Sequence, residues 1–400
     1  MAQTLRMRQI GLGIATFVVA IIFILWSPRR REYQPYSPSI STPVPASSGR
    51  SFGPDYHGQS SPADINRVTN STLGFSKIFV IGLPERTDKR DAMTLTSSLT
   101  GFNLEFIDGV KGEAVPDKAI PFGKNRDNLP NTYLGSWRSH MNAVRRQVLS
   151  PQFNGLPKND AGQWRIPPIV EEDLESALIM EDDMDWDVRL QSQLETVAKG
   201  TRALSGSGST PNSPYGDGWD LLWLGHCGEI FPEQLPENEG EPLYSKFFIN
   251  NDKTVPPLDK ITGLVDFKSH PEFTRWVHVT GAPICSFAYA LTRRGAQKVL
   301  FDLSVDRLDA NFDNALGTFC RNGGSRKGDP TGLHAKCLTV TPPVFFHHRP
   351  KGLIGSESDI VDHGDESQNI REKGTSENIM WSARNNIRNM LMNTKMESQF

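Results

Sequence analysis

The sequence has few cysteines and no excess of basic charge. Among its 400 residues, 43 Lys and Arg stand against 46 Asp and Glu, so the charge does not suit a phosphate backbone and we expect no nucleic-acid partner. Four cysteines, Cys227, Cys285, Cys320 and Cys337, are too few for a disulfide scaffold and lack a Cys-x-x-Cys zinc spacing. In an oxidising lumen they allow three pairings into two disulfides, and simple burial of Cys285 and Cys337 in strands explains them equally well.

Long hydrophobic runs are also missing, with one exception at residues 10–26. These 17 uncharged, mainly apolar residues would form a helix of about 26 Å. No small-residue cleavage site follows, so we predict an uncleaved signal-anchor in preference to a cleavable signal peptide. Residues 1–9 would be a short cytosolic tail, although the flanking arginines do not determine the orientation. Residues 27–72, rich in Pro and Ser, are predicted to be a disordered stem that ends near the only glycosylation sequon, at Asn70.

From Lys77 onward, apolar runs alternate with segments of helical periodicity. Strands are expected at 77–83, 102–108, 176–182, 219–225, 284–291 and 337–340. Helices are expected up to about Leu99, at 131–149, after Thr292, and at 376–392. This alternation predicts an α/β fold with a mostly parallel sheet covered by helices on both faces. We expect the domain to span 73–355, with insertions at 151–173 and 229–275 and a polar C-terminal extension at 356–400.

The segment with the most chemistry follows the apolar strand near residue 180. Five carboxylates, Glu181, Asp182, Asp183, Asp185 and Asp187, occur within seven residues. Ligands bind at the carboxyl edge of open α/β sheets, and Mg²⁺ or Mn²⁺ commonly bridges carboxylates to substrate phosphates. We therefore predict a metal that holds a diphosphate, with a solvated acidic helix start as the alternative. An EF-hand beginning at Asp183 is excluded, because Val188 and Leu194 stand where Gly and Glu are needed.

Other candidate residues are scattered along the chain. Asp309 and Asp313 are candidate general bases, or exposed acids on a helix. Either His347 or His348 fits a metal or phosphate site. Arg86 and Arg90 follow the first strand, where a nucleotide meets an α/β sheet, and Ser139 and His140 lie on the helix predicted at 131–149. The alternatives are a solvated helix start for the arginines and a packed core group for His140. The candidates are Arg86, Arg90, Ser139, His140, Asp309, Asp313, His347 and His348.

Together these segments resemble glycosyltransferase family 25, which includes lipooligosaccharide and procollagen galactosyltransferases. The resemblance rests on Gly82 to Arg90, Gly135 to His140, Leu178 to Asp183, Gly281 to Ala296, and Asp313 to Leu316, in the family's order. Gly82 and Ser136 depart from the family pattern. The membrane anchor and longer loops look like those of a fungal-type member.

The resemblance implies a GT-A-like fold and transfer of a hexose, galactose in typical members, from a UDP-linked donor with inversion. It implies that Glu181 and Asp183 serve the metal and the donor, with Asp182 and Asp185 as near alternatives, and that Asp313 is preferred over Asp309 as base. Ser139 and His140 would shape the donor pocket, beside Arg86 and Arg90. His348 or His347 would complete the metal site.

The same resemblance implies Mn²⁺ or Mg²⁺ as cofactor and a glycan or glycoprotein as acceptor. It places the protein in the Golgi or endoplasmic reticulum membrane as a single-pass type II protein with a lumenal catalytic domain. The alternative function is a non-catalytic member of the same fold that binds a glycan or another partner.

Overall fold

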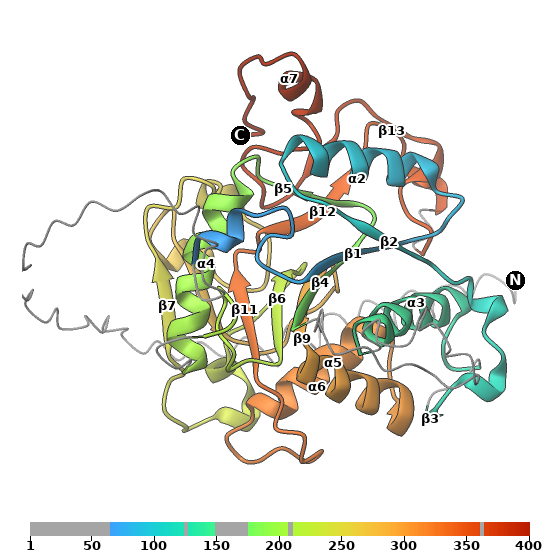
Figure 1. Cartoon of the computed structure of the whole chain (residues 1–400), viewed down its shortest axis with the longest axis vertical. Coiled ribbons are helices and arrows are strands. Elements are labelled where there is room, and N and C mark those ends of the chain that lie inside the picture. The colour runs from blue at the N-terminus through green and yellow to red at the C-terminus, as the bar shows by residue number, and fades with distance from the viewer. Residues whose placement is uncertain (1–64, 124–126, 149–174, 207–210, 361–363) are drawn as a thin grey trace, which may run out of the picture. The chain divides into compact units, whose positions relative to one another are not determined.

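An eight-stranded sheet forms the centre of the computed structural model, which describes residues 65–123, 127–148, 175–206, 211–360 and 364–400 (Figure 1). The strand order is β2-β1-β4-β9-β6-β11-β8-β7. These strands are β1 (Lys77–Gly82), β2 (Glu105–Asp108), β4 (Ser176–Glu181), β6 (Leu221–Gly225), β7 (Lys246–Ile249), β8 (Arg275–Val279), β9 (Ala288–Thr292) and β11 (Cys337–Thr341).

The predicted fold class, a mostly parallel GT-A-like sheet behind a transmembrane helix, is wrong. Only three of the seven strand pairings are parallel: β1 with β2, β1 with β4, and β6 with β11. The other four are antiparallel, because β9 runs against both β4 and β6, and β8 against both β11 and β7. A buried apolar run such as that of β9 predicts a strand but carries no information on its direction.

Helices cover both faces of this mixed sheet (Figure 1). On one face α2 (Thr87–Leu99) and α4 (Leu190–Ser205) pack against alternate residues of the strands, and on the other face lie α3 (Asn131–Val148), α5 (Arg293–Leu300) and α6 (Phe312–Gly324). Successive strand residues point to opposite faces, and both sets are buried. The central strands therefore appear in the sequence as continuous apolar runs.

Strand β7 lies within the segment 229–275, which the sequence marked as an insertion, and β8 begins at the last residue of that segment. Arg275, at the start of β8, is 1% exposed and donates to the carboxylate of Asp252 and to the carbonyl oxygens of Pro342 and Pro343. Because β8 contains this arginine and His278, its composition does not resemble that of a core strand.

The C-terminal segment packs on the domain by backbone pairing. Strand β12 (Phe345–Arg349) pairs with β5 (Met184–Trp186) and with β15 (Thr375–Ser376). The helix predicted at 376–392 is present only as α7 (Ile387–Leu391). Residues before α7 instead bond to the β5 region, where Ala383 N–H donates to Trp186 O. Shorter elements are β3 (Phe122–Gly123) with β10 (Arg307–Leu308), β13 (Gly352–Leu353) with β14 (Ile370–Arg371), and a π-helical segment at Phe301–Asp306.

The N-terminal predictions are described only in part. The predicted cytosolic tail, the membrane span at 10–26 and most of the stem lie outside the described residues, within which no helix is long and apolar enough to cross a membrane. Ile65–Thr69 forms a 3₁₀ helix whose Val68 is buried in the core. Asn70 is exposed, and its Oδ1 accepts hydrogen bonds from the N–H groups of Thr72 and Gly74.

The four cysteines form two disulfides, Cys227–Cys285 and Cys320–Cys337. The first joins the loop after β6 to the loop before β9. A second tie between these loops is Glu229, which is 1% exposed and accepts hydrogen bonds from the N–H groups of Gly281 and Ala282. Burial raises the pKa of Glu229 to about 8, although the backbone donors oppose this shift.

We expect Glu229 to make stability depend on pH. The unfolded chain releases this proton near pH 4.5, whereas the folded chain holds it to about pH 8. The stabilisation is therefore full below the unfolded pKa and is lost as pH rises through the folded pKa. In Glu229→Gln the unfolding free energy should fall less between about pH 5 and about pH 8 than in the wild type. Urea denaturation at both pH values tests this. An equal fall of the unfolding free energy with pH in Glu229→Gln and the wild type would contradict it. The control is Glu239→Gln, which alters an exposed carboxylate.

Candidate functional site

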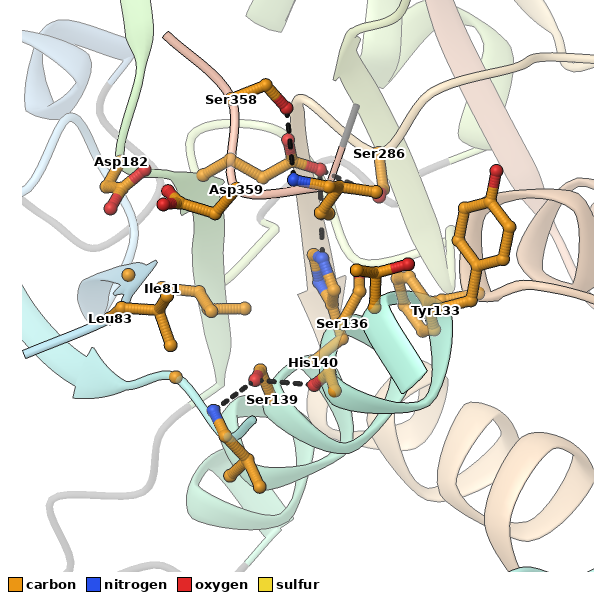
Figure 2. A pocket seen from close by; sticks show the side chains of 18 of the residues that line it. Ile81, Leu83, Tyr133, Ser136, Ser139, His140, Asp182, Ser286, Ser358 and Asp359 are labelled. Atoms are coloured by element: carbon orange, nitrogen blue, oxygen red, sulfur yellow. Dashed lines mark hydrogen bonds and ion pairs between the residues drawn. The ribbon is translucent and has the colours of Figure 1, made fainter. Parts of the chain in front are cut away.

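A cavity of about 620 Å³ opens at the carboxyl ends of β1, β2 and β4. Its walls come from the loops after these strands, from the first half of α3, from the loop before β9, and from the start of α6. His347 of β12 and the C-terminal residues Ser358, Asp359 and Ile360 complete the lining. In Figure 2, Asp182 and Asp359 lie on one side of the cavity and Tyr133 of α3 on the other.

The cavity brings together about half of the predicted site residues. Those that line it are Ser139, His140, Glu181, Asp182, Asp183, Asp313 and His347. Those that do not line it are Arg86, Arg90, Asp185, Asp309 and His348. Segments as far apart in the sequence as Ile81 and Ile360 meet here. The loops after β1, β2 and β4 come together because these parallel strands end at the same edge of the sheet.

Lys89 of α2 is the cation at the centre of the acidic cluster. Its Nζ lies 3.2 Å from Asp182 Oδ1, 3.0 Å from Asp183 Oδ2 and 3.4 Å from Asp359 Oδ2. Burial alone would lower the pKa of Lys89, but the charges of Asp183 and Asp182 outweigh it and raise the pKa above its ordinary value. The lysine is therefore a permanent positive charge in this site.

The two neighbouring aspartates of this cluster differ in their protonation. Burial, followed by the adjacent charge of Asp183, raises the pKa of Asp182 to about 7. Burial would also raise the pKa of Asp183, but Lys89 and His347 hold it well below its ordinary value. Asp183 is thus the ionised member of the pair. Gly82 allows this arrangement, because a Cβ at that position would lie 2.2 Å from Asp182 Oδ2.

Two polar atoms beside Asp183 have no hydrogen-bond partner. They are the buried Asp183 Oδ1 and His347 Nε2, and this His347 nitrogen lies 3.6 Å from Asp183 Oδ2. Carboxylate oxygen and imidazole nitrogen are ligands for Mn²⁺, and such ions take their remaining ligands from water and substrate phosphates. Among the described residues no group of three or more His, Cys, Asp or Glu is placed to hold a metal. Asp183 Oδ1 and His347 Nε2 are the two partnerless atoms here that a cation could contact.

Asp185 and His348, two predicted metal ligands, lie in a separate buried cluster. Asp185 is fully buried and accepts hydrogen bonds from the hydroxyls of Ser376 and Ser382 and from the Arg384 N–H. His348 Nδ1 lies 2.8 Å from Ser376 Oγ. Successive residues of β12 point to opposite sides, so His347 faces the cavity and His348 faces the C-terminal segment. This second cluster holds that segment against β5.

Glu181 lies at the far end of the acidic run, where it contacts a different set of groups. Its Oε1 accepts a hydrogen bond from Ser286 Oγ at 3.0 Å and lies 3.7 Å from His140 Nε2. His140 Nδ1 is 3.0 Å from Tyr289 Oη, and its ring stacks on Phe312 at 4.1 Å. The imidazole is therefore fixed on three sides and orients the Glu181 carboxylate.

Ser139 supports the cavity wall through its hydroxyl. Ser139 Oγ accepts a hydrogen bond from the Val110 N–H at 2.7 Å and donates one to Gly135 O at 2.7 Å. Both interactions are visible as dashed lines in Figure 2. Ser139 therefore joins α3 to the loop after β2.

The two candidate bases occupy different environments. Asp313 lines the cavity, and its carboxylate accepts hydrogen bonds from Asn311 Nδ2 at 2.6 Å and from the Cys285 N–H at 3.3 Å. Asp309 pairs with Arg307 at the surface, where its side chain is 54% exposed. Of the two, Asp313 is placed to meet a ligand in the cavity.

The two arginines predicted to bind a donor are ion-paired just outside the cavity. Arg86 contacts Asp88 at 2.8 Å and Asp359 at 2.5 Å, and Arg90 contacts Asp108 at 2.5 Å. The charged run after the first strand contains Lys89 between Arg86 and Arg90, but the predicted site residues included neither Lys89 nor Asp359. The Asp-Lys-Arg run after β1 was a signal for Lys89. No local signal marked Asp359, which lies in the segment expected to be a polar extension.

Neither a protein-family model nor a curated protein matches this chain.

Asp183 and Asp185 should respond differently to substitution. Asp185→Ala leaves buried hydroxyl and N–H donors without an acceptor, so the unfolding free energy should fall by about 3 kcal/mol or more. Asp183→Asn removes a repulsion with Asp182 but also loses the ion pair with Lys89, while the side-chain shape is kept, so the thermal midpoint should fall less than in Asp185→Ala. Thermal unfolding of both variants checks this. A loss of stability in Asp183→Asn as large as that in Asp185→Ala would mean that the whole acidic run is structural.

Proposed function

We propose that this protein is a glycosyltransferase that moves a hexose, galactose by the family resemblance, from a nucleotide-sugar donor to a glycan or glycoprotein acceptor. The observation that carries the proposal is the shared cavity. The carboxylate of Asp313 and the ion-paired cluster of Lys89 and Asp183 line the same cavity of about 620 Å³. Ligand pockets of about 300–1,000 Å³ hold molecules of nucleotide size.

Different parts of the cavity lining suit different parts of a donor. Ile81, Leu83 and the backbone of Gly109 offer an apolar surface with close backbone approach for a base and ribose. The charged cluster around Lys89 suits the diphosphate. Asp313, from the start of α6, lies in the part of the wall that would face the sugar and the acceptor hydroxyl.

The chemistry follows from these positions. The acceptor hydroxyl transfers its proton to the Asp313 carboxylate while its oxygen forms a bond to C1 of the donor sugar. The bond between C1 and the phosphate oxygen breaks, and its electron pair remains on the leaving diphosphate. Attack on the face opposite to the leaving group inverts the configuration at C1. Asn311 and the Cys285 N–H hold the Asp313 carboxylate in place for this transfer.

Charge on the leaving diphosphate must be neutralised by the site. Lys89 supplies one fixed positive charge, and preorganised charges of this kind stabilise a transition state without reorganisation. Asp183 and His347 are the residues that would hold Mn²⁺ or Mg²⁺. When bound there, such an ion acts as a Lewis acid toward the phosphate oxygens.

Both disulfides support a location in an oxidising compartment, such as the lumen of the Golgi or endoplasmic reticulum. The exposed Asn70 in its sequon agrees with this location. Its Oδ1 accepts the hydrogen bonds of the local turn, so its Nδ2, the atom to which a glycan is attached, is not the atom that makes them.

A matched pair of variants tests the proposal. Asp313→Asn should lower turnover by at least about 100-fold while nucleotide binding is retained, because the general base is lost. Asp309→Asn should leave turnover unchanged, because Asp309 lies outside the cavity. Both are measured as nucleotide release from UDP-galactose, UDP-glucose, UDP-N-acetylglucosamine and GDP-mannose, in Mn²⁺ and in EDTA.

The same screen separates the enzyme from its alternative. Metal-dependent release from one donor, lost in Asp313→Asn, identifies a transferase and its donor. Nucleotide binding without release, in the presence of a broad set of glycan acceptors, would favour a non-catalytic binding protein. Equal turnover in Asp313→Asn and the wild type would exclude Asp313 as the base.

A further inference from the structure

Asp359 forms ion pairs with two cations at the edge of the cavity. Its Oδ2 lies 2.5 Å from Arg86 Nη1 and 3.4 Å from Lys89 Nζ. The aspartate is about 270 residues away from these partners in the sequence and belongs to the C-terminal segment. One carboxylate oxygen is thus shared by two positive side chains, as a phosphate oxygen would be.

The chain around Asp359 has a buried anchor and a more exposed tip. The Glu357 side chain is 3% exposed and pairs with Arg371 at 2.5 Å. Two residues later, the Asp359 side chain is 35% exposed and lines the cavity with Ser358. Arg86 Nη2 also donates to Ser356 O at 3.0 Å. The Asp359 side chain can therefore turn away from the cavity while the Glu357 anchor holds the segment in place.

The negative charges around Lys89 disfavour a further anion beside Asp359. Lys89 already contacts Asp182 and Asp183, and Asp359 is the third carboxylate on the same ammonium group. A diphosphate that approached this group would be repelled by Asp359 at hydrogen-bonding distance. A phosphate group and the Asp359 carboxylate therefore compete for the ammonium group of Lys89.

Arg86 and Lys89 remain suited to phosphate once Asp359 has moved. Both lie at the start of α2 directly after β1, and the two positive groups converge on one oxygen of Asp359. A guanidinium beside an ammonium group is a common phosphate-binding pair. Of the three carboxylates on Lys89, Asp359 is the most exposed and the most distant from Nζ, so it is the one that a phosphate can displace.

We propose that Arg86 and Lys89 form a phosphate subsite at the edge of the cavity, and that Asp359 occupies this subsite until the diphosphate of a nucleotide displaces it. This inference rests on the proposed function, and it identifies both the phosphate-binding cations and an internal competitor. Asp359 lowers the affinity for the nucleotide, because each binding event must first break its two ion pairs.

The test is the affinity for a nucleoside diphosphate in the wild type and in Asp359→Asn. UDP and GDP are titrated by calorimetry in Mn²⁺ with the whole folded chain. Asp359→Asn should bind the nucleotide at least about fivefold more tightly, because the competing charge is absent while the side-chain shape is kept. Arg86→Ala should bind it at least about tenfold more weakly, because one phosphate-binding cation is lost.

Two controls protect this comparison. Asp365→Asn removes an exposed charge from the same C-terminal segment, does not line the cavity, and should leave the affinity unchanged. Asp359→Ser also removes the charge and should show the same gain in affinity as Asp359→Asn. Thermal unfolding identifies a variant that folds poorly, and the other variant then carries the test.

The outcomes separate this inference from the proposed function. Wild-type binding of UDP or GDP with equal or weaker binding by Asp359→Asn would overturn the subsite inference and leave the glycosyltransferase proposal intact. Weaker binding in particular would mean that Asp359 holds the ligand and does not compete with it. If every folded form fails to bind either nucleotide, both proposals are wrong.

Discussion

The buried ammonium group of Lys89 connects the parts of the protein that form the cavity. It joins α2, the acidic turn after β4, and the C-terminal segment through three carboxylates. Carboxylates this close repel one another, so a fixed cation is needed to keep Asp183 ionised beside Asp182. The cavity therefore depends on one charge that comes directly after the first strand.

A second constraint holds the same region from behind. Asp185 accepts hydrogen bonds from donors of the C-terminal segment, and the half-buried Arg384 donates to the backbone oxygens of Asp182 and Met184. The residues of the acidic run therefore have two different roles. Asp182 and Asp183 face the cavity, whereas Asp185 attaches the C-terminal segment that carries Asp359. Residues expected to be an extension in fact supply one wall of the site.

The sequence indicated the central strands and the acidic residues at the cavity, because these depend on local patterns. Six strands were found from apolar runs, and the carboxylates followed from their position at a strand end. The direction of β9 was not predictable, since apolar runs do not encode orientation. His347 and His348 point to opposite sides because they are successive residues of strand β12. The sequence did not predict a strand there, so it could not tell which histidine faces the cavity. The role of Asp359 required a contact with Arg86 across the whole domain, and no periodicity records such a contact.

The most direct measurement is hydrogen–deuterium exchange of the whole chain with Mn²⁺ and each nucleotide sugar. For one donor, we expect slower exchange confined to the cavity, in peptides covering 109–113, 181–183 and 285–287, which all contribute to its lining. Exchange in α5 and α4 should stay unchanged. Slower exchange only outside these peptides, or none with any donor, would contradict a nucleotide-sugar site at this edge of the sheet.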